Sequence, residues 1–231
     1  MTREIKWTEI TNSDQGNLEK VLKIYDQALP IELREPHDIF QKGLKYAESS
    51  FPNNFRFLVG MEDDTVVSFA TAHYLAEVNA GFIVYIATNP LASARGIGSQ
   101  TILKIEELLN KDALSAGNNS LRLSILETEI EEMAQTEAEK EDCIKRQHFF
   151  GKNNFHKYEG IDYLQPPLHG DDEGIPLHLF IKNIQGAPTR TQDEVSKIVQ
   201  AMYREKYYAV NGIDLAVLNN CLKKMKVKKL S

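Results

Sequence analysis

The sequence predicts a mixed α/β fold, because strand patterns and helix patterns both recur along its 231 residues. Runs rich in Val, Phe and Tyr, such as residues 55–61 and 65–76, favour β-strands. Segments with apolar residues three or four positions apart, such as residues 18–25 and 102–109, favour amphipathic helices. With 42% hydrophobic residues the chain can bury a full core, and its length suits one domain with an appendage.

The first eighty residues predict a strand, two helices and a hairpin. Ser13 is a candidate cap for the first helix, and Pro30 ends it. The acidic turn Glu62-Asp63-Asp64 joins two strand-like runs into an antiparallel hairpin. In order, we expect a strand at residues 4–10, helices at about 13–29 and 38–48, and strands at 55–61 and 65–76.

Residues 81–109 predict a buried strand, a glycine-bearing loop and a helix. The apolar run 82–87 reads as the strand, and Asn89-Pro90 ends it. The first backbone N–H groups of the following helix lack internal partners, and the helix dipole favours an anion there. Gly96 and Gly98 allow close approach to the backbone, and Arg95 adds a cation. The stretch therefore predicts a diphosphate-binding loop.

Two nucleotide-binding motifs do not fit this loop. A P-loop needs Lys-Ser/Thr after its second glycine, whereas Ser99-Gln100 follows Gly98 here. A dinucleotide fingerprint needs a third glycine at position 101, which is Thr. A small kinase is thereby disfavoured, and an ordinary strand-to-helix turn stays open as the simplest alternative.

The stretch resembles the signature of the Gcn5-related N-acetyltransferases (GNAT), strand-V-x-P-x-x-[QR]-x-x-G-x-G-[AS]-helix. Thr88-Asn89-Pro90 stands for the V-x-P element, and Ser93 to Ser99 stand for the loop. Ser93 replaces the family's usual Gln or Arg, and Thr88 replaces its valine. The resemblance implies a mostly antiparallel sheet flanked by helices, acetyl-CoA as cosubstrate and no metal. The coenzyme-binding residues it implies are Ile86, Ala87, Thr88, Ala94, Arg95, Gly96, Ile97, Gly98 and Ser99.

The resemblance also implies transfer of an acetyl group to an amine by direct attack. An amine with a pKa of about 10 is protonated at neutral pH, so a base must take its proton. Glu127, at the end of the strand predicted at 121–126, is our first candidate, with a surface glutamate as the alternative. It opens an acidic segment, residues 127–142, that we expect to be largely solvated.

The helix predicted at about 140–152 lacks the proton donor of the resembling family. Phe150 falls where those enzymes carry a tyrosine that protonates the departing thiolate, and Cys143 replaces a frequent asparagine. An acetyl-CoA-binding module without catalytic activity is therefore the alternative function. His148 is a further acid or base candidate, ranked below Glu127 and Tyr163.

A Y-x-Q-P-P-L string, residues 163–168, resembles a bacterial subgroup of these acetyltransferases. Tyr163 and Gln165 become candidates for substrate contact or proton donation, and a packed sheet tyrosine is the alternative for Tyr163. The apolar run 176–181 predicts a buried strand.

We assign residues 1–188 to the acetyltransferase domain and residues 189–231 to a C-terminal helical extension with a basic tail. Thr191 or Asp193 caps a helix there, and Gly212 separates it from a second. We expect this helical hairpin to pack on the parent sheet or to form a homodimer interface.

Composition limits the partners. A net charge of −6 argues against nucleic acid, and no apolar run reaches the ~18 residues that span a bilayer. The first ten residues lack a secretion signal, and two cysteines without metal spacing suit a reducing compartment. We expect a cytoplasmic enzyme without membrane contact whose acceptor is a small-molecule amine or a protein amino group.

Overall fold

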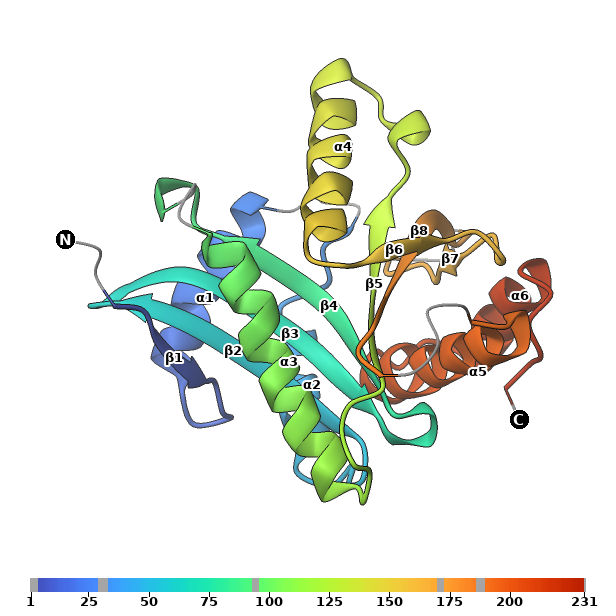
Figure 1. Cartoon of the computed structure of the whole chain (residues 1–231), viewed down its shortest axis with the longest axis horizontal. Coiled ribbons are helices and arrows are strands. Elements are labelled where there is room, and N and C mark those ends of the chain that lie inside the picture. Colours follow the sequence, from blue (N-terminus) through green and yellow to red (C-terminus); the bar gives the residue numbers. More distant parts are fainter. Residues whose placement is uncertain (1–3, 29–32, 93–95, 170–172, 186–189, 231) are drawn as a thin grey trace. The chain divides into compact units, whose positions relative to one another are not determined.

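The computed structural model describes residues 4–28, 33–92, 96–169, 173–185 and 190–230 (Figure 1). The chain forms two compact units, which we describe separately. The first unit comprises Met1–Ala76 and Ile83–Ser120, and the second comprises Glu77–Phe82 and Leu121–Ser231. Among the described residues, every helix is too short or too polar to cross a bilayer.

The first unit contains strands in the order β1 (Lys6–Glu9), β2 (Asn54–Glu62), β3 (Thr65–Leu75) and β4 (Ala80–Thr88), the last of which begins in the second unit. Strands β2 and β3 pair antiparallel, with Glu62 opposite Thr65 and a register shift at Gly60/Met61. Asp63, with φ 50°, makes the turn between them. The predicted hairpin is therefore present.

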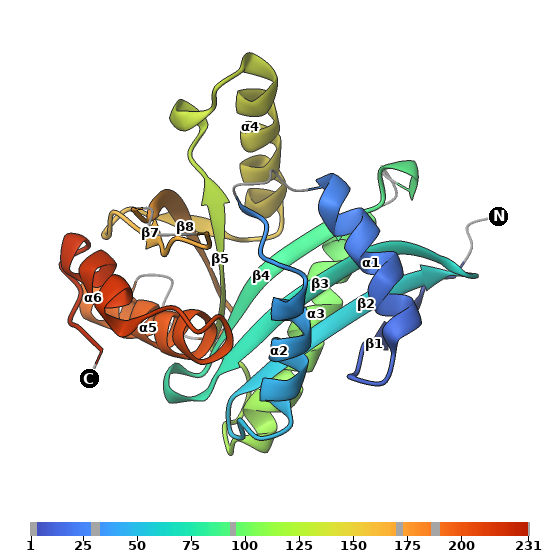
Figure 2. The same cartoon turned by 180° about the vertical axis from the view of Figure 1, so that it is seen from behind.

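Helices cover both faces of these strands. Helices α1 (Gln15–Ala28) and α2 (Asp38–Ala47) lie on one face, and α3 (Ile97–Ser115) lies on the other (Figures 1 and 2). The first helix is capped by Asp14, whose Oδ1 accepts the Asn17 N–H at 3.3 Å, and not by Ser13 as the sequence suggested. Aromatic rings meeting edge to face hold these layers together, with Tyr25 at 4.9 Å from Phe40 and 5.0 Å from Tyr85.

The second unit is built on β8 (Ile175–Asn183), which pairs antiparallel with β5 (Leu123–Glu129), β6 (His156–Tyr158) and β7 (Leu164–Gln165). Strand β5 is followed by one turn, η4 (Glu131–Met133), and by helix α4 (Glu137–Lys152). Thr136 and Glu139 form a capping box at the start of α4. The segment after β5 is mostly exposed, as the acidic composition predicted.

The C-terminal residues form the predicted helical hairpin. Helix α5 (Gln192–Met202) continues directly into a π-helix, η5 (Tyr203–Val210), and α6 (Leu215–Lys224) follows (Figure 1). Gly212, at φ 72°, makes the break between them, because this left-handed conformation favours glycine. Thr191 is the cap of α5, with Glu194 completing a capping box.

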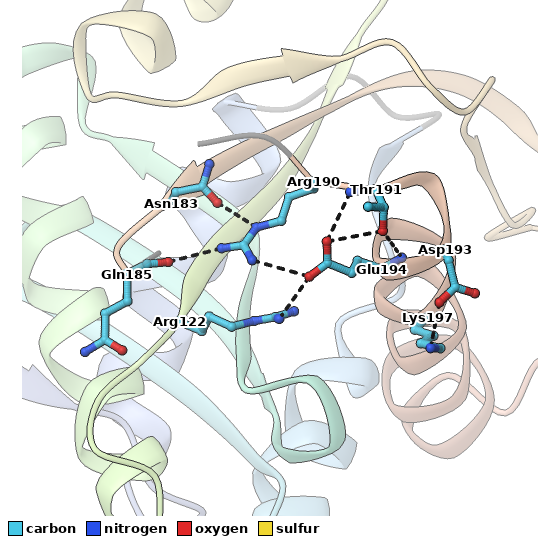
Figure 3. Close-up of polar contacts among 8 residues, drawn as sticks. All are labelled: Arg122, Asn183, Gln185, Arg190, Thr191, Asp193, Glu194 and Lys197. Carbon is cyan, nitrogen blue, oxygen red and sulfur yellow. Dashed lines mark hydrogen bonds and ion pairs between the residues drawn. The ribbon is translucent and has the colours of Figure 1, made fainter. Parts of the chain in front are cut away.

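A polar cluster holds the start of α5 to the strands of the second unit (Figure 3). The Arg190 side chain is 8% exposed, and its guanidinium donates to Asn183 Oδ1 at 2.8 Å and to the Gln185 carbonyl at 3.2 Å. The Glu194 carboxylate pairs with Arg190 at 3.6 Å and accepts from Arg122 at 3.4 Å. The same Glu194 therefore caps the helix and joins it to the residue preceding β5.

Candidate functional site

Strand β4 ends in a turn fixed by Asn89. Its backbone N–H donates to the Val67 carbonyl at 2.9 Å, and its side-chain amide donates to the Val66 carbonyl at 3.2 Å. The Asn89 Oδ1 accepts the Leu91 N–H at 3.0 Å, which starts the single turn η3 (Pro90–Ala92). The Asn89-Pro90 pair thus ends the strand, as predicted, and pins its end to β3.

Helix α3 begins at Ile97 with Gly96 in the left-handed conformation, at φ 70° and ψ 14°. A Cβ built on Gly96 would meet none of the described residues within 4 Å, and the positive φ itself favours glycine here. Gly96 carries no side chain to cap the helix, and the first amides of a helix have no intrahelical acceptor. Residues 96–99 therefore present the helix N-terminus that an anion requires.

A buried hydrogen-bond chain fixes this N-terminus against strands β3 and β4. The Thr101 hydroxyl donates to the Ile97 carbonyl at 2.8 Å and lies 2.7 Å from the Ser68 hydroxyl. The Ser68 hydroxyl also lies 2.8 Å from the Ala87 carbonyl, and its single proton is shared between that carbonyl and the Thr101 hydroxyl. Both side chains are fully buried, so the strand end and the first helical turn hold a defined distance.

Several of the predicted coenzyme-binding residues are brought together in the first unit. Ile86, Ala87 and Thr88 lie half-buried at the end of β4, and Gly96, Ile97, Gly98 and Ser99 form the start of α3. Ala94 and Arg95 lie outside the described residues, as does Ser93.

Glu127 lies at the centre of a hydrogen-bonded cluster in the second unit. Its Oε1 accepts from the Tyr163 hydroxyl, and the Tyr207 hydroxyl lies 3.0 Å from each carboxylate oxygen. The Gln165 side-chain amide donates to Glu127 Oε2 at 3.2 Å and to the Tyr207 hydroxyl at 3.4 Å. The two predicted catalytic residues, Glu127 and Tyr163, are therefore in direct contact.

The local fold explains this convergence. Glu127 lies within β5 opposite Leu179 of β8, and Tyr163 directly precedes β7, which pairs with the start of β8. The sequence placed Glu127 at the end of its strand. The structure corrects this, because β5 continues to Glu129.

Burial raises the pKa of Glu127 from its usual 4.5 to about 7. The hydrogen bonds from Tyr163, Tyr207 and Gln165 and the charge of Lys206 oppose this effect, because each favours the carboxylate. Burial also raises the pKa of Tyr163 well above 10, and the neighbouring Glu127 charge adds to it. The cluster thus pairs a carboxyl group that titrates near neutrality with a phenol that keeps its proton.

Tyr207 was not among the residues that the sequence suggested for the site. The apolar stripe of the C-terminal extension predicts that a tyrosine four residues after Tyr203 lies on the packed face. Nothing in that pattern indicates that its hydroxyl meets a carboxylate from β5, because the contact joins residues 80 positions apart.

The remaining candidates lie elsewhere in the second unit. Phe150 is buried in α4 against Phe149 and Phe155, with ring centroids 5.2 and 6.0 Å away, and it is a core residue. His148 is exposed on the same helix.

Side chains of Glu131, Glu132 and His178 place potential metal ligands within 4.8 Å of one another. Glu131 is already bonded to Gln147 at 2.5 Å and paired with His178 at 3.4 Å, and Glu132 is exposed. This group supports no metal assignment.

Comparison with known proteins agrees with the fold. Residues 18–123 match the model of the acetyltransferase (GNAT) family. A search of curated proteins found no significant match. The matched segment spans less than half of the chain, and it is the part whose sequence is similar to this family.

Solved structures share the fold. A protein from Bacteroides thetaiotaomicron assigned to the GNAT family is similar with a TM-score of 0.64 at 20% identity, covering 90% of this chain and 99% of that one. An aminoglycoside 6'-N-acetyltransferase complexed with coenzyme A is similar with a TM-score of 0.53 at 14% identity, covering 80% and 99%. A ribosomal-protein alanine N-acetyltransferase from Escherichia coli is similar with a TM-score of 0.50 at 13% identity, covering 81% and 99%.

These likenesses establish the fold class. The chain has the mixed α/β architecture of GNAT acyltransferases, with a mostly antiparallel sheet flanked by helices and additional helices at the C-terminus. The matched segment 18–123 contains the strand, the loop and the helix of the predicted anion site. It ends before Glu127, so the carboxylate cluster lies outside the matched residues.

Proposed function

We propose that this protein is an N-acetyltransferase that transfers the acetyl group of acetyl-CoA to an amine. The acceptor is the amine of a small molecule or an amino terminus, and the amine attacks the thioester directly. The family match and the helix N-terminus at Gly96 support acetyl-CoA as the cosubstrate. Residues 1–188 would be the acetyltransferase domain of the subgroup with the Y-x-Q-P-P-L string, and residues 189–231 its extension.

In this proposal the coenzyme is held by backbone groups of the first unit. The amides of residues 96–99 and the Arg95 side chain would bind the pyrophosphate. The strand amides of residues 86–88 would hold the pantetheine and polarise the thioester carbonyl. This electrostatic assistance does not depend on the side chain at position 150.

The environment of Glu127 is the observation that supports an amine as the acceptor. A general base works best when its pKa lies near the working pH, and burial brings this carboxyl to about 7. Glu127 takes a proton from the ammonium group, the freed nitrogen attacks the carbonyl carbon, and a C–N bond forms. As the C–S bond breaks, the nitrogen loses its second proton to water and coenzyme A leaves as a thiolate. Tyr163 is the candidate proton donor to this thiolate, and the proton held on Glu127, which its hydroxyl contacts, restores the phenol.

Gln165 supports an acceptor with more than one N–H. Its side chain is 7% exposed, and among the residues the structure describes its Oε1 has no hydrogen-bond partner, although the Nε2 contacts Glu127. A buried acceptor without a partner costs about 1–3 kcal/mol, which a bound donor would offset. A primary amine that donates one N–H to Glu127 keeps another for this oxygen.

The proposal is tested by binding and turnover together. Calorimetric titration should show binding of acetyl-CoA and none of ATP-magnesium, and a thiol-release screen over amines should identify an acceptor. Glu127→Gln should keep the affinity for acetyl-CoA and lower kcat about 100-fold or more. Glu159→Gln, the same change at an exposed residue, is the matched control.

The alternative is a binding module without turnover, motivated by Phe150 at the family's tyrosine position. It predicts acetyl-CoA binding without thiol release from any amine. If neither acetyl-CoA nor a longer acyl-CoA binds, residues 95–99 are an ordinary turn and both functions fail.

A further inference from the structure

The C-terminal hairpin contributes a side chain to the Glu127 cluster. Tyr207 lies in the π-helix η5 and is 1% exposed, and its hydroxyl is 3.0 Å from both oxygens of Glu127. Because this contact involves both oxygens, it restrains rotation of the carboxylate about its last side-chain torsion. Tyr163, in contrast, contacts only Oε1. We infer that Tyr207 is a positioning residue, through which the C-terminal hairpin completes the base site.

The packing around Tyr207 fixes its hydroxyl in place. Its ring meets Tyr203 edge to face at 5.5 Å, and Tyr203 meets Tyr163 in the same way at 6.4 Å. The Tyr203 hydroxyl donates to the Leu164 carbonyl, which ties η5 to β7 beside Gln165. The three rings are almost fully buried, so the hydroxyl of Tyr207 has little freedom to leave the carboxylate.

The helix geometry is unusual at this point. The Asn211 N–H donates to the Lys206 carbonyl at 3.0 Å, five residues back, which is the bond of a π-helix. π-Helical segments are rare, and they are frequent at functional sites. Here the wide turn carries Lys206, Tyr207 and Tyr208, of which Tyr207 reaches Glu127 and Tyr208 is 45% exposed.

Several groups of the neighbouring elements act on the ionisation of Glu127. Tyr163 and Gln165 contact it from β7 and the preceding residue, and β8 places the apolar Leu179 opposite it. From η5, Tyr207 donates to it, Tyr203 lies nearby, and Lys206, bonded to Asn211 at 2.8 Å, favours the carboxylate by its charge. Removing the Tyr207 hydroxyl takes away a donor to the ionised form and leaves the burial unchanged.

The inference rests on the proposed function, so the experiment separates the two. Tyr207→Phe is compared with Tyr208→Phe, the same change one residue on at an exposed ring, in the full chain with acetyl-CoA and an acceptor amine. A hydrogen bond to a charged group is worth about tenfold or more. We expect kcat/KM at pH 7 to fall about tenfold in Tyr207→Phe and the acid limb of its pH profile to move upward. Part of the loss should remain near pH 9, where the carboxylate is ionised but less restrained.

Tyr203→Phe is the control for stability. It also removes a buried hydroxyl from η5, but that hydroxyl donates to the Leu164 backbone carbonyl and not to Glu127. Its melting temperature should fall, while the acid limb should move less than in Tyr207→Phe, because the Tyr203 hydroxyl does not contact Glu127. A Tyr207→Phe profile that matches that of Tyr208→Phe, or a loss that is equal at every pH, overturns the inference and leaves the proposed function intact.

Carbon-13 titration of the Glu127 carboxyl gives a readout that needs no turnover. If Tyr207→Phe moves this titration upward while no amine supports thiol release, the contact is confirmed and the proposed function fails. A titration that Tyr207→Phe leaves in place overturns the inference, whatever the activity.

Discussion

At the scale of the single residue, the burial that suits Glu127 to act as a general base also lowers the stability of the fold above pH 4.5. Its ordinary pKa of 4.5 applies to the unfolded chain, and burial raises the value to about 7 in the folded state. Between these values the unfolded chain releases the proton and the folded chain keeps it. The free energy of unfolding therefore falls as the pH rises through this window, by about 3 kcal/mol in total.

Glu127→Gln should remove this pH dependence, because glutamine stays neutral. The variant's stability relative to the natural protein should increase by up to about 3 kcal/mol between pH 4.5 and pH 8, while turnover is lost. Urea unfolding at both pH values measures the change. Glu159→Gln should show no such trend, and a difference that is constant with pH would mean that Glu127 is not desolvated.

At the scale of the element, α3 begins after Gly96, which adopts a left-handed backbone conformation. Gly96 and Gly151 both have open space where a Cβ would go, but only Gly96 has a positive φ. Gly96→Ala should cost about 1–2 kcal/mol of stability and weaken acetyl-CoA binding. Gly151→Ala, inside α4, should be neutral or stabilising by up to about 1 kcal/mol.

Thermal unfolding and calorimetry with acetyl-CoA check this pair. A loss of stability in Gly96→Ala without a loss of affinity would separate the glycine from the coenzyme site. Equal effects of the two substitutions would contradict the role given to the left-handed conformation.

Thr101→Val tests whether the Ser68–Thr101 chain holds the helix N-terminus. The substitution keeps the shape and leaves the buried Ser68 hydroxyl without its partner at 2.7 Å. We expect a loss of about 1–3 kcal/mol of stability and weaker acetyl-CoA binding. Ser99→Ala, at the start of the same helix and half-buried, should leave the stability within about 0.5 kcal/mol. Unchanged affinity in Thr101→Val would show that the chain is structural only.

The sequence could predict elements whose signal is local. The apolar run ended by Asn89-Pro90, the hairpin turn at Asp63 and the break at Gly212 all depend on neighbours a few residues apart, and all are present. The cap of the first helix and the end of β5 were wrong, because Asp14 competed with Ser13 and the pairing with β8 extended the strand. Tyr207 could not be found, because its role depends on a distant strand.

At the scale of the whole molecule, the family match and the carboxylate cluster fall on different parts of the chain. Residues 18–123 include β4, the predicted anion-binding loop and α3, whereas Glu127, Tyr163 and Tyr207 follow this segment. The shared part therefore corresponds to coenzyme binding in our proposal. Selection of the acceptor amine would depend on residues of the second unit, most of which lies outside the matched segment.

The anchoring of the C-terminal hairpin gives the last prediction. Glu194 caps α5, accepts from Arg122 and pairs with Arg190, and α5 continues into the π-helix that carries Tyr207 (Figure 3). Glu194→Ala should lower the stability by about 1–2 kcal/mol and speed amide hydrogen exchange in Tyr203–Val210.

Asp193→Ala is the matched control, because it removes the carboxylate next to Glu194 in the chain. Among the described residues, the Asp193 carboxylate pairs with the exposed Lys197 at 2.7 Å and with no other residue. Exposed pairs of this kind contribute about 0.5 kcal/mol or less, so exchange in the π-helix should not change. If Glu194→Ala loosens the π-helix and also moves the acid limb of the pH profile upward, the cap of α5 and the ionisation of Glu127 are coupled through one helix. Faster exchange with an unchanged pH profile would confine Glu194 to a structural role.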